Sequence, residues 1–234
     1  MPDEPWWKQG AAEMTGAFAL VFVGVGSVVA TSAQGFDPSV AFVARGLAIG
    51  AVIIAMASAL AHVSGGQITP AVTLGLLAAG KIRATMAAAI VAFQLVGSVL
   101  AGLLLLTIYP SAPGSLGTPR LGTGLDDGST NSTILGIVIE LVLAFFLVFV
   151  VFATAIDPRG AAKQVSGLPI GLAAAMCWFV GGNLTGAAIS PGRWLGPAVA
   201  TLNFGEWYVY TIGPIVGGVM AGVLYAFVFL PKDA

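Results

Sequence analysis

Two short stretches of this chain decide its fold: SGGQITPAVTLG, residues 64–75, and TGAAISPGRWLG, residues 185–196. Each follows a long apolar run, and each contains a Thr-Pro or Ser-Pro pair. Thr and Ser are favoured N-caps of helices, and proline is favoured at the first helical position. The apolar sequence after each pair is too short to cross a bilayer, which takes about 20 residues. Both stretches therefore predict a half-helix that enters a membrane and turns back.

The composition places the chain in a lipid bilayer. Of its 234 residues 58% are hydrophobic and only 8% are charged, whereas soluble domains carry about 25% charged residues. The net charge of −1 gives no reason to expect a nucleic-acid partner. The chain has one cysteine, Cys177, and one histidine, His62, so we expect no disulfide, no metal site and no cofactor. The sequence contains no nucleophile–base pair and no phosphate-binding loop, so we expect no catalytic residue and no enzymatic activity.

Six segments are long and apolar enough to span the bilayer. They predict an all-α membrane protein with six transmembrane helices plus two re-entrant half-helices. The predicted spans cover residues 11–31, 40–60, 84–108, 134–155, 167–182 and 207–230. Between the third and fourth spans the chain is rich in Gly, Pro, Ser and Asp, which is typical of a loop outside the hydrocarbon.

The two halves of the chain repeat each other. Further matched pairs are ARGLAIG (44–50) with VSGLPIG (165–171), and QLVGSVLAGLLL (94–105) with PIVGGVMAGVLY (214–225). Each half has three spans, an odd number, so the second copy is inverted in the membrane and the functional site is expected near the midplane. The predicted organisation is one channel domain, 1–234, with a first inverted repeat (1–110), an extracellular connecting loop (111–133) and a second inverted repeat (134–234).

Basic residues set the predicted orientation. Six of them fall on one side of the membrane if both termini share a compartment: Lys8, Lys81, Arg83, Arg159, Lys163 and Lys232. On the other side only Arg120 lies in a clear loop. Positive charge favours the cytoplasmic side, so both termini are expected in the cytoplasm. The N-terminal residues lack the basic region of a cleaved signal, and a multi-pass protein of a bacterial inner membrane or a plasma membrane is expected.

Glu13 and Glu140 occupy matching places in EMTGAFALVFV (13–23) and ELVLAFFLVFV (140–150). A carboxylate is costly in lipid and should face protein. Half-helices at membrane depth must be buried in protein or line a water-filled cavity, and the free N–H groups of their loops need acceptors. We therefore predict that the two glutamates are structural braces for the re-entrant loops. The alternative for the two stretches is helices lying in the membrane interface, which is disfavoured because neither has a strongly charged face.

Together these residues resemble the aquaporins, or major intrinsic proteins, over nearly the whole chain. The resemblance rests on the six-span inverted repeat, the two half-helix motifs, the paired glutamates and ATAIDPRG (153–160) after the fourth span. It implies a homotetramer in a lipid bilayer, each subunit having its own pore for water or small neutral solutes. The chain departs from the family at the two motifs, which usually read Asn-Pro-Ala. Here they are Thr69, Pro70, Ala71 and Ser190, Pro191, Gly192.

The loss of both asparagines changes what the centre of the pore can offer. An asparagine amide has two N–H donors besides its accepting oxygen, whereas a hydroxyl has one donor that rotates. With Thr69 and Ser190 as N-caps, each directs a single O–H at passing water, more weakly and in a less fixed direction. The half-helix N-termini still carry positive partial charge, which repels cations and rejects protons. Whether the changed motifs reduce conduction or permit a proton leak is left open by the sequence.

The resemblance also implies a four-residue selectivity constriction on the outer side of the pore. Its members here are Ile49, Trp178, Ala187 and Arg193. An intramembrane arginine is a functional residue by default. The resemblance further implies that His62 lines the inner vestibule of the pore. Gln67 stands where many members of the family have a histidine near the first motif, so its amide is expected to contact pore water in the same vestibule.

The sequence thus predicts a passive channel for water and small neutral solutes that excludes ions. Ile49 and Ala187 suggest a glycerol- or urea-type facilitator as an alternative. A non-conducting membrane scaffold is a second alternative, suggested by the loss of both asparagines. Trp178 has two opposing effects on selectivity. Its apolar indole favours solutes with an apolar edge, whereas its bulk narrows the constriction. The sequence does not decide between size and polarity.

Overall fold

The computed structural model of the chain describes residues 4–110, 116–160 and 165–231, and Lys163 and Lys232 of the charge argument lie outside these ranges. Within the described ranges the regular structure is helical. The elements are α1 (Trp6–Ala33), α2 (Pro38–Ser64), α3 (Pro70–Ala78), α4 (Ala84–Ile108), α5 (Thr130–Val151), η1 (Phe152–Ile156), α6 (Gly167–Gly181), α7 (Pro191–Thr201), α8 (Trp207–Leu224) and η3 (Tyr225–Phe229). η1 and η3 are π-helical ends of α5 and α8. The predicted all-α membrane fold is confirmed.

The membrane-spanning helices follow the predicted segments closely. Among the described residues five helical segments are long and apolar enough to cross a bilayer: α1, α2, α4, α5 with η1, and α8 with η3. The fifth predicted span, α6, is shorter, with 15 residues. α5 begins at Thr130 rather than at 134, because the Ser129 hydroxyl caps it by accepting from the Ser132 N–H at 3.1 Å.

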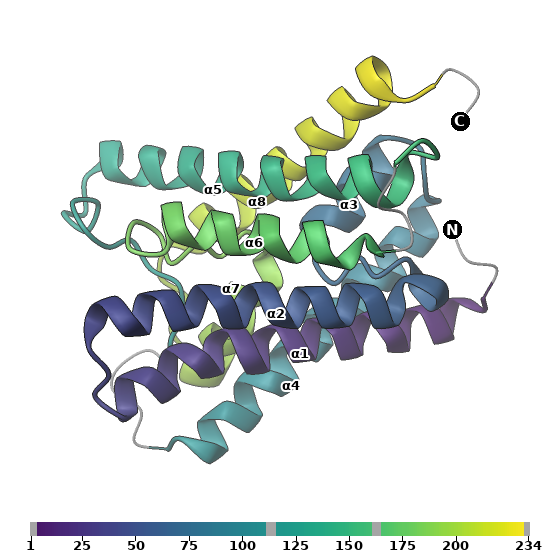
Figure 1. The fold of residues 1–234 in the computed structure, drawn as a ribbon. Helices are drawn as coiled ribbons and strands as arrows, with labels where there is room; N and C mark the ends of the chain where they lie inside the picture. Colours follow the sequence, from purple (N-terminus) through teal and green to yellow (C-terminus); the bar gives the residue numbers. More distant parts are fainter. Residues whose placement is uncertain (1–3, 111–115, 161–164, 232–234) are drawn as a thin grey trace.

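The long helices lie side by side in one bundle, and α1 begins at the same end of it as η3 finishes (Figure 1). We call this the inner end and the opposite one the outer end. α3 follows the inner end of α2 and leads into α4, whereas α7 follows the outer end of α6 and leads into α8. The two half-helices contact each other inside the bundle. They therefore enter from opposite ends and meet, as the inverted repeat requires.

The repeat is also visible in how the helices pack. A Cβ atom on Gly97 of α4 would overlap the carbonyl oxygen of Met14 in α1, and one on Gly217 of α8 would overlap that of Leu141 in α5. Both contacts bring two backbones together over a residue without a side chain, as small residues allow in membrane helices. Gly97 and Gly217 occupy matching places in the two halves, so the same close crossing holds α1 to α4 and α5 to α8.

An Asp-Pro pair follows the first span of each half. Asp37 caps α2 by accepting from the N–H of Ser39 at 2.9 Å. Asp157 accepts from the N–H of Arg159 at 2.9 Å, and from its guanidinium at 3.0 and 2.7 Å. Tyr225 also donates to Asp157, at 3.1 Å. The same two-residue turn therefore begins a helix at the outer end and ties η1 to η3 at the inner end.

Candidate functional site

The tip of the inner half-helix α3 is built by Thr69 and Pro70. Thr69 is extended, with φ −127° and ψ 142°, and its side-chain oxygen accepts from the Val72 N–H at 3.4 Å. Pro70 occupies the first helical turn, where its missing N–H leaves no bond unmade. The hydroxyl hydrogen of Thr69 is not used by this cap, so it remains available to a molecule at the tip.

The tip of the outer half-helix α7 differs, and the predicted side-chain cap at Ser190 is wrong. Ser190 stands at the N-cap position with φ −158° and ψ 130°, but its side chain makes no capping bond. Serine lacks the β-methyl group that restricts the rotamer of threonine, so its hydroxyl can turn away from the backbone. The third motif residue, Gly192, is explained by α4, because a Cβ there would lie 2.7 Å from the Ser98 hydroxyl oxygen.

Glu13 of α1 is buried and binds the loop that precedes α3. One carboxylate oxygen accepts from the Ser64 hydroxyl at 2.6 Å and from the Gln67 N–H at 2.8 Å. The other accepts from the Ile68 N–H at 2.5 Å and from the side-chain amide of Gln94 at 2.9 Å. Four donors from three segments thus converge on one carboxylate, which supplies the acceptors that the loop amides need.

Glu140 of α5 repeats this arrangement around the loop that precedes α7. It accepts from the Thr185 hydroxyl at 2.6 Å and from the N–H groups of Ala188 at 2.9 Å and Ile189 at 2.7 Å. Sequence reasoning anticipated loop amides as partners but missed the hydroxyl donors Ser64 and Thr185. These two residues begin the two matched stretches, so their equivalence was the signal that could have found them.

The two glutamates hold strained backbone. Ile68 has φ +65° and Ile189 has φ +49°, a region that β-branched residues almost never adopt. Each such residue costs on the order of 1–3 kcal/mol and persists only where its surroundings impose it. The N–H of each isoleucine donates to a carboxylate oxygen, and these charge-assisted bonds offset the strain.

The structure brings the four expected constriction residues together near the tip of α7. Arg193 donates to the carbonyl oxygens of Gly186 at 2.6 Å and Ala187 at 2.9 Å. Its guanidinium lies 5.5 Å from the centroid of the Trp178 ring. A Cβ on Gly24 would lie 3.4 Å from Ile49 and 3.7 Å from Arg193, so these two side chains border the same space.

All four of these side chains are buried. Their exposed fractions are 1% for Ile49, 4% for Trp178, 2% for Ala187 and 2% for Arg193. Arg193 is held by backbone carbonyls and forms no ion pair with any carboxylate of the described residues, so its positive charge is unpaired there. The site is therefore a narrow ring with one fixed cation, one aromatic face, one aliphatic side chain and one small residue.

Trp178 is clamped from behind by α2. Its indole N–H donates to the carbonyl oxygen of Phe42 at 2.8 Å, and its ring lies 5.9 Å from the Phe42 ring. A Cβ on Gly46 would come within 2.7 Å of Trp178 Cδ1. An indole has a single donor, so Trp178 presents only its apolar ring to the constriction. This contact joins residues 136 positions apart, and no local pattern in the sequence pointed to it.

Outside the ring lies a cavity of about 600 Å³, the outer cavity. Its lining includes Trp178 and Arg193 of the ring together with Arg45, Arg120 and Asp126. Arg45 lies within the apolar helix α2. It is fixed by donating to the hydroxyls of Thr31 at 2.7 Å and Ser32 at 3.0 Å. The lining of the outer cavity therefore carries more basic than acidic side chains.

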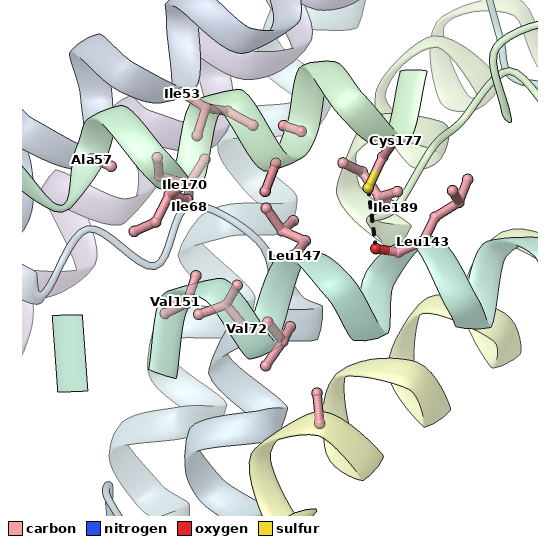
Figure 2. Packing of buried hydrophobic residues seen from close by; sticks show 14 of the residues in the cluster. Ile53, Ala57, Ile68, Val72, Leu143, Leu147, Val151, Ile170, Cys177 and Ile189 are labelled. Atoms are coloured by element: carbon pink, nitrogen blue, oxygen red, sulfur yellow. Dashed lines mark hydrogen bonds between the residues drawn. The ribbon is translucent and has the colours of Figure 1, made fainter. Parts of the chain in front are cut away.

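On the inner side of the ring lies a much smaller cavity of about 10 Å³, the inner cavity. It is lined by Ile53, Gly66, Gln67, Ile68, Thr69, Val72, Leu147, Val151 and Ile170. Figure 2 shows several of these apolar side chains packed between the helices. Gln67 belongs to this lining, and its predicted contact with pore water stays a prediction. His62 is exposed and lies outside this lining, so its vestibule role stays a prediction.

Comparison with known proteins assigns the family. A sequence profile described as major intrinsic protein matches residues 2–225. Aquaporin TIP4-4 of Zea mays is 40% identical over 224 residues, covering 94% of this chain and 86% of the maize protein. Aquaporin-4 of Mus musculus is 34% identical over 229 residues, covering 97% and 69% of the two chains.

A solved structure shares the fold. The aquaglyceroporin from Plasmodium falciparum superposes with a TM-score of 0.83 at 21% identity, covering 96% of this chain and 97% of that one. The architecture of six spans and two half-helices is therefore that of a known membrane channel. With the profile match and the two relatives, this shows that the chain belongs to the major intrinsic protein family of non-enzymatic, multi-pass membrane channels for water and small solutes.

Proposed function

We propose that the chain is a passive channel that conducts water down its gradient and rejects ions and protons. The observation that carries this proposal is the buried ring around Arg193, whose cation is held by two loop carbonyls and has Trp178 beside it. A ring in which every side chain is at most 4% exposed favours a molecule as small as water. The fixed cation disfavours any cation in the same space.

The two half-helices support charge exclusion along the rest of the pore. Their N-termini, at Thr69 and Ser190, each carry about half a positive charge. They enter from opposite ends of the bundle and contact each other, so both positive ends act on the middle of the path. Positive half-helix ends repel protons and cations. Ion exclusion therefore does not depend on the asparagines that the two motifs lack.

Hydrogen bonding at the motifs supports passage of water. Thr69 uses its oxygen as a cap and keeps its O–H, whereas Ser190 has no capping bond and keeps both its donor and its acceptor capacity. We propose that each hydroxyl donates one hydrogen bond to water passing the tips. Ser190 is free to rotate, so the orientation of water is fixed less strongly at the outer tip than at the inner tip.

A glycerol- or urea-type facilitator is the second candidate, and the clamp on Trp178 favours it. Because the indole N–H is bonded to Phe42, the ring offers an apolar wall facing the polar Arg193. A solute with one apolar and one hydrogen-bonding edge fits such a pair of walls. The bulk of Trp178 narrows the constriction and argues against the passage of these larger solutes. The measured permeability to glycerol and urea decides between the two candidates.

We also propose a homotetramer with both termini in the cytoplasm of a bacterial cell or beneath a plasma membrane. The family resemblance supports the tetramer. Four basic residues at the inner end support the orientation: Lys8 at the start of α1, Lys81 and Arg83 between α3 and α4, and Arg159 just after η1. Cytoplasmic ends are rich in Lys and Arg.

The test is a vesicle assay on the purified protein. Proteoliposomes are shrunk with sucrose and followed by light scattering, and the measurement is repeated with glycerol and with urea. Shrinkage faster than that of empty vesicles supports the water channel, and rapid reswelling in glycerol or urea supports the facilitator. A proton-sensitive dye in the same vesicles measures leak. Rates equal to those of empty vesicles with every solute would support a non-conducting scaffold instead.

A further inference from the structure

We propose that the outer cavity is a binding site for a small free oxyanion such as inorganic phosphate, held by Arg45 of α2 and Arg193 of α7. The bound ion stands at the entrance of the arginine ring and slows the entry of water. The binding does not depend on the proposed channel function, whereas the effect on flow rests on that function.

The charges that line the outer cavity favour an anion. The lining carries three arginines, Arg45, Arg120 and Arg193, against one carboxylate, Asp126. Arg120 and Asp126 are exposed, and the solvent screens exposed charges. Arg45 is half-buried and Arg193 is buried, so their charges are screened less. Neither forms an ion pair with a carboxylate in the described part of the chain, and the cavity therefore contains uncompensated positive charge.

Arg45 is held in place by neutral acceptors and keeps donors for a ligand. Its Nε donates to the Thr31 hydroxyl at 2.7 Å, and its Nη2 donates to the Ser32 hydroxyl at 3.0 Å and the Val28 carbonyl oxygen at 3.4 Å. These bonds position the guanidinium without neutralising it. Its Nη1 makes no hydrogen bond to any described residue, so the two N–H groups of that nitrogen remain for a ligand.

Arg193 also has unused donors, at the inner limit of the cavity. Its Nη1 donates to the carbonyl oxygens of Gly186 and Ala187. Its Nε is buried and has no hydrogen-bond partner within residues 4–110, 116–160 and 165–231. Nη2 makes no hydrogen bond to those residues either. The backbone thus positions this guanidinium through one nitrogen and leaves the others to whatever occupies the space beside it.

The two guanidinium groups are placed to act on one ligand. Arg45 precedes the ring residue Ile49 by four positions on α2, which is about 6 Å along the helix axis. Ile49 and Arg193 border the same space beside Gly24 of α1. Both arginines line the same cavity of about 600 Å³. An ion that approaches Arg193 from the outer end therefore passes Arg45 and can accept from both.

Oxyanion chemistry fits these donors, and the ring stops the ion. Arginine presents N–H groups in a planar fork that matches phosphate and carboxylate, and such charge-assisted bonds are stronger than neutral ones. Trp178 offers no donor in the cavity, because its indole N–H is bonded to Phe42. The four ring side chains are at most 4% exposed, so an ion larger than water remains above the ring. There it occupies the volume through which water enters.

The place of the cavity favours a free ion over a lipid headgroup. Its lining comes from α1, α2, α6 and α7 together with the loop residues 116–126. These segments belong to both halves of the chain and surround the mouth of the pore. A lipid beside the bundle contacts only the outer faces of the helices, whereas a dissolved ion reaches the cavity directly from the outer end.

The binding experiment titrates inorganic phosphate into the purified protein by calorimetry at constant ionic strength, in lipid-free detergent and in phosphatidylcholine nanodiscs. We expect saturable binding to wild type in both, and binding about tenfold weaker in Arg45→Gln. Arg120→Ala is the matched control, because it removes an exposed arginine from the same cavity; we expect a change of at most about threefold. If Arg45→Gln does not fold, Arg45→Lys keeps the charge without the fork and should bind with intermediate affinity.

The flow experiment measures osmotic shrinkage of proteoliposomes with phosphate on both sides of the membrane, compared with chloride at the same ionic strength and osmolarity. We expect the water permeability of wild type to fall with phosphate and to level off at concentrations that saturate binding. Arg45→Gln should need about tenfold more phosphate for the same fall. Unchanged flow at saturating phosphate would overturn the effect on water entry.

The other outcomes separate the site from the channel function. The site is overturned if folded wild type binds no phosphate saturably, or if Arg120→Ala weakens binding as much as Arg45→Gln does. If phosphate binds in lipid-free detergent and not in nanodiscs, a lipid headgroup takes the site and the free ion is overturned as its ligand. If binding follows expectation but wild-type vesicles shrink like empty ones in chloride, the channel function fails while the site stands.

Discussion

The two re-entrant loops have the same backbone but different side chains. In each, a buried glutamate accepts from the N–H of an isoleucine in the left-handed region, Ile68 in one loop and Ile189 in the other. Three residues after the cap-position residue the loops diverge, because Val72 stands where the second loop has Arg193. Val72 lines the inner cavity and Arg193 the outer one.

This difference separates the requirements of folding from those of selection. A helix that starts inside a membrane needs a cap, acceptors for its loop amides and close packing, and both halves meet these needs at equivalent positions. The first tip is joined to α4 by side chains as well, since Gln94 bonds both Glu13 and Thr73 at 2.9 and 3.0 Å. The second tip instead carries the cation of the ring. The repeat thus specifies the scaffold, and the departures from it shape the arginine ring that we propose as the selectivity filter.

The largest expected effect is on stability, and it should be unequal between the halves. In Glu13→Gln one carboxylate oxygen becomes an NH2 group, which then faces two donors, such as the Ile68 N–H and the Gln94 amide. In Glu140→Gln the NH2 group can replace the oxygen that accepts only from the Ile189 N–H, so it faces one donor. A buried donor without a partner costs about 1–3 kcal/mol. We expect a loss of about 2–6 kcal/mol for Glu13→Gln and about 1–3 kcal/mol for Glu140→Gln, measured by unfolding in detergent.

Equal losses for the two variants would contradict this comparison. A Glu13→Gln variant that is as stable as wild type would indicate that Glu13 already carries a proton, because a neutral acid, like an amide, keeps one acceptor oxygen and presents hydrogen at the other position. Circular dichroism on both proteins before unfolding controls for the helix content.

The next effect is on ion exclusion. Arg193→Val gives the second loop the residue of the first and removes the fixed cation from the ring. We expect proton leak to rise by about tenfold or more, which corresponds to a barrier lowered by about 1.4 kcal/mol. The dye assay in vesicles measures it. Arg120→Ala is the matched control, because Arg120 is exposed in the outer cavity and does not belong to the ring. An equal rise in both variants would mean that net charge, rather than the ring, excludes protons.

A smaller effect should follow from a larger residue placed behind Trp178, on the side away from the pore. In Gly46→Ala the added methyl group would meet the indole at 2.7 Å, and the ring must move toward the constriction. We expect water permeability to fall by up to about tenfold if about 1.4 kcal/mol of overpacking enters the barrier. Gly26→Ala on α1 is the control, because its Cβ would meet only a Leu105 methyl group at 3.2 Å. A fall in both variants would point to general loosening of the bundle.

The smallest effect concerns the Asp-Pro turn that differs between the halves. Hydrogen bonds from the Arg159 guanidinium are the main cause that lowers the pKa of Asp157, which lies outside the membrane spans. A lowered folded-state pKa adds stability above the unfolded value and loses it as pH falls through the folded value. We expect Asp157→Asn to melt slightly below wild type at pH 7, and the difference to shrink as pH falls below about 4, the ordinary aspartate pKa. A difference as large at pH 2 as at pH 7 would assign it to packing of Tyr225 instead.

Much of the scaffold could be predicted from sequence because its signals are local. Hydrophobic length gave the spans, and Thr-Pro and Ser-Pro gave the starts of α3 and α7, which begin at Pro70 and Pro191 as expected. Loop amides as partners of Glu13 and Glu140 followed from the cost of a carboxylate in lipid. Each of these inferences needs only the residue and its immediate neighbours.

The parts that could not be predicted depend on contacts between distant residues. The acceptor for the Trp178 indole is the backbone of Phe42 on another helix. The free side chain of Ser190 depends on rotamer freedom rather than on residue type. The inner cavity lies where α2, α5 and α6 present ordinary aliphatic residues to one another. Such residues look the same in sequence whether they face lipid, core or pore.

The outer and inner cavities differ in volume, and this difference has a practical consequence for small-molecule blockers of the channel. The outer cavity of about 600 Å³ is within the range that holds drug-sized molecules, about 300–1,000 Å³, whereas the inner cavity measures about 10 Å³. The permeability of a passive channel is the same in both directions, but its two ends differ in their access for a blocker. Added to vesicles with randomly inserted protein, such a blocker would stop only the copies whose arginine-lined outer cavity faces the bulk solution, and shrinkage would continue more slowly through the copies inserted the other way.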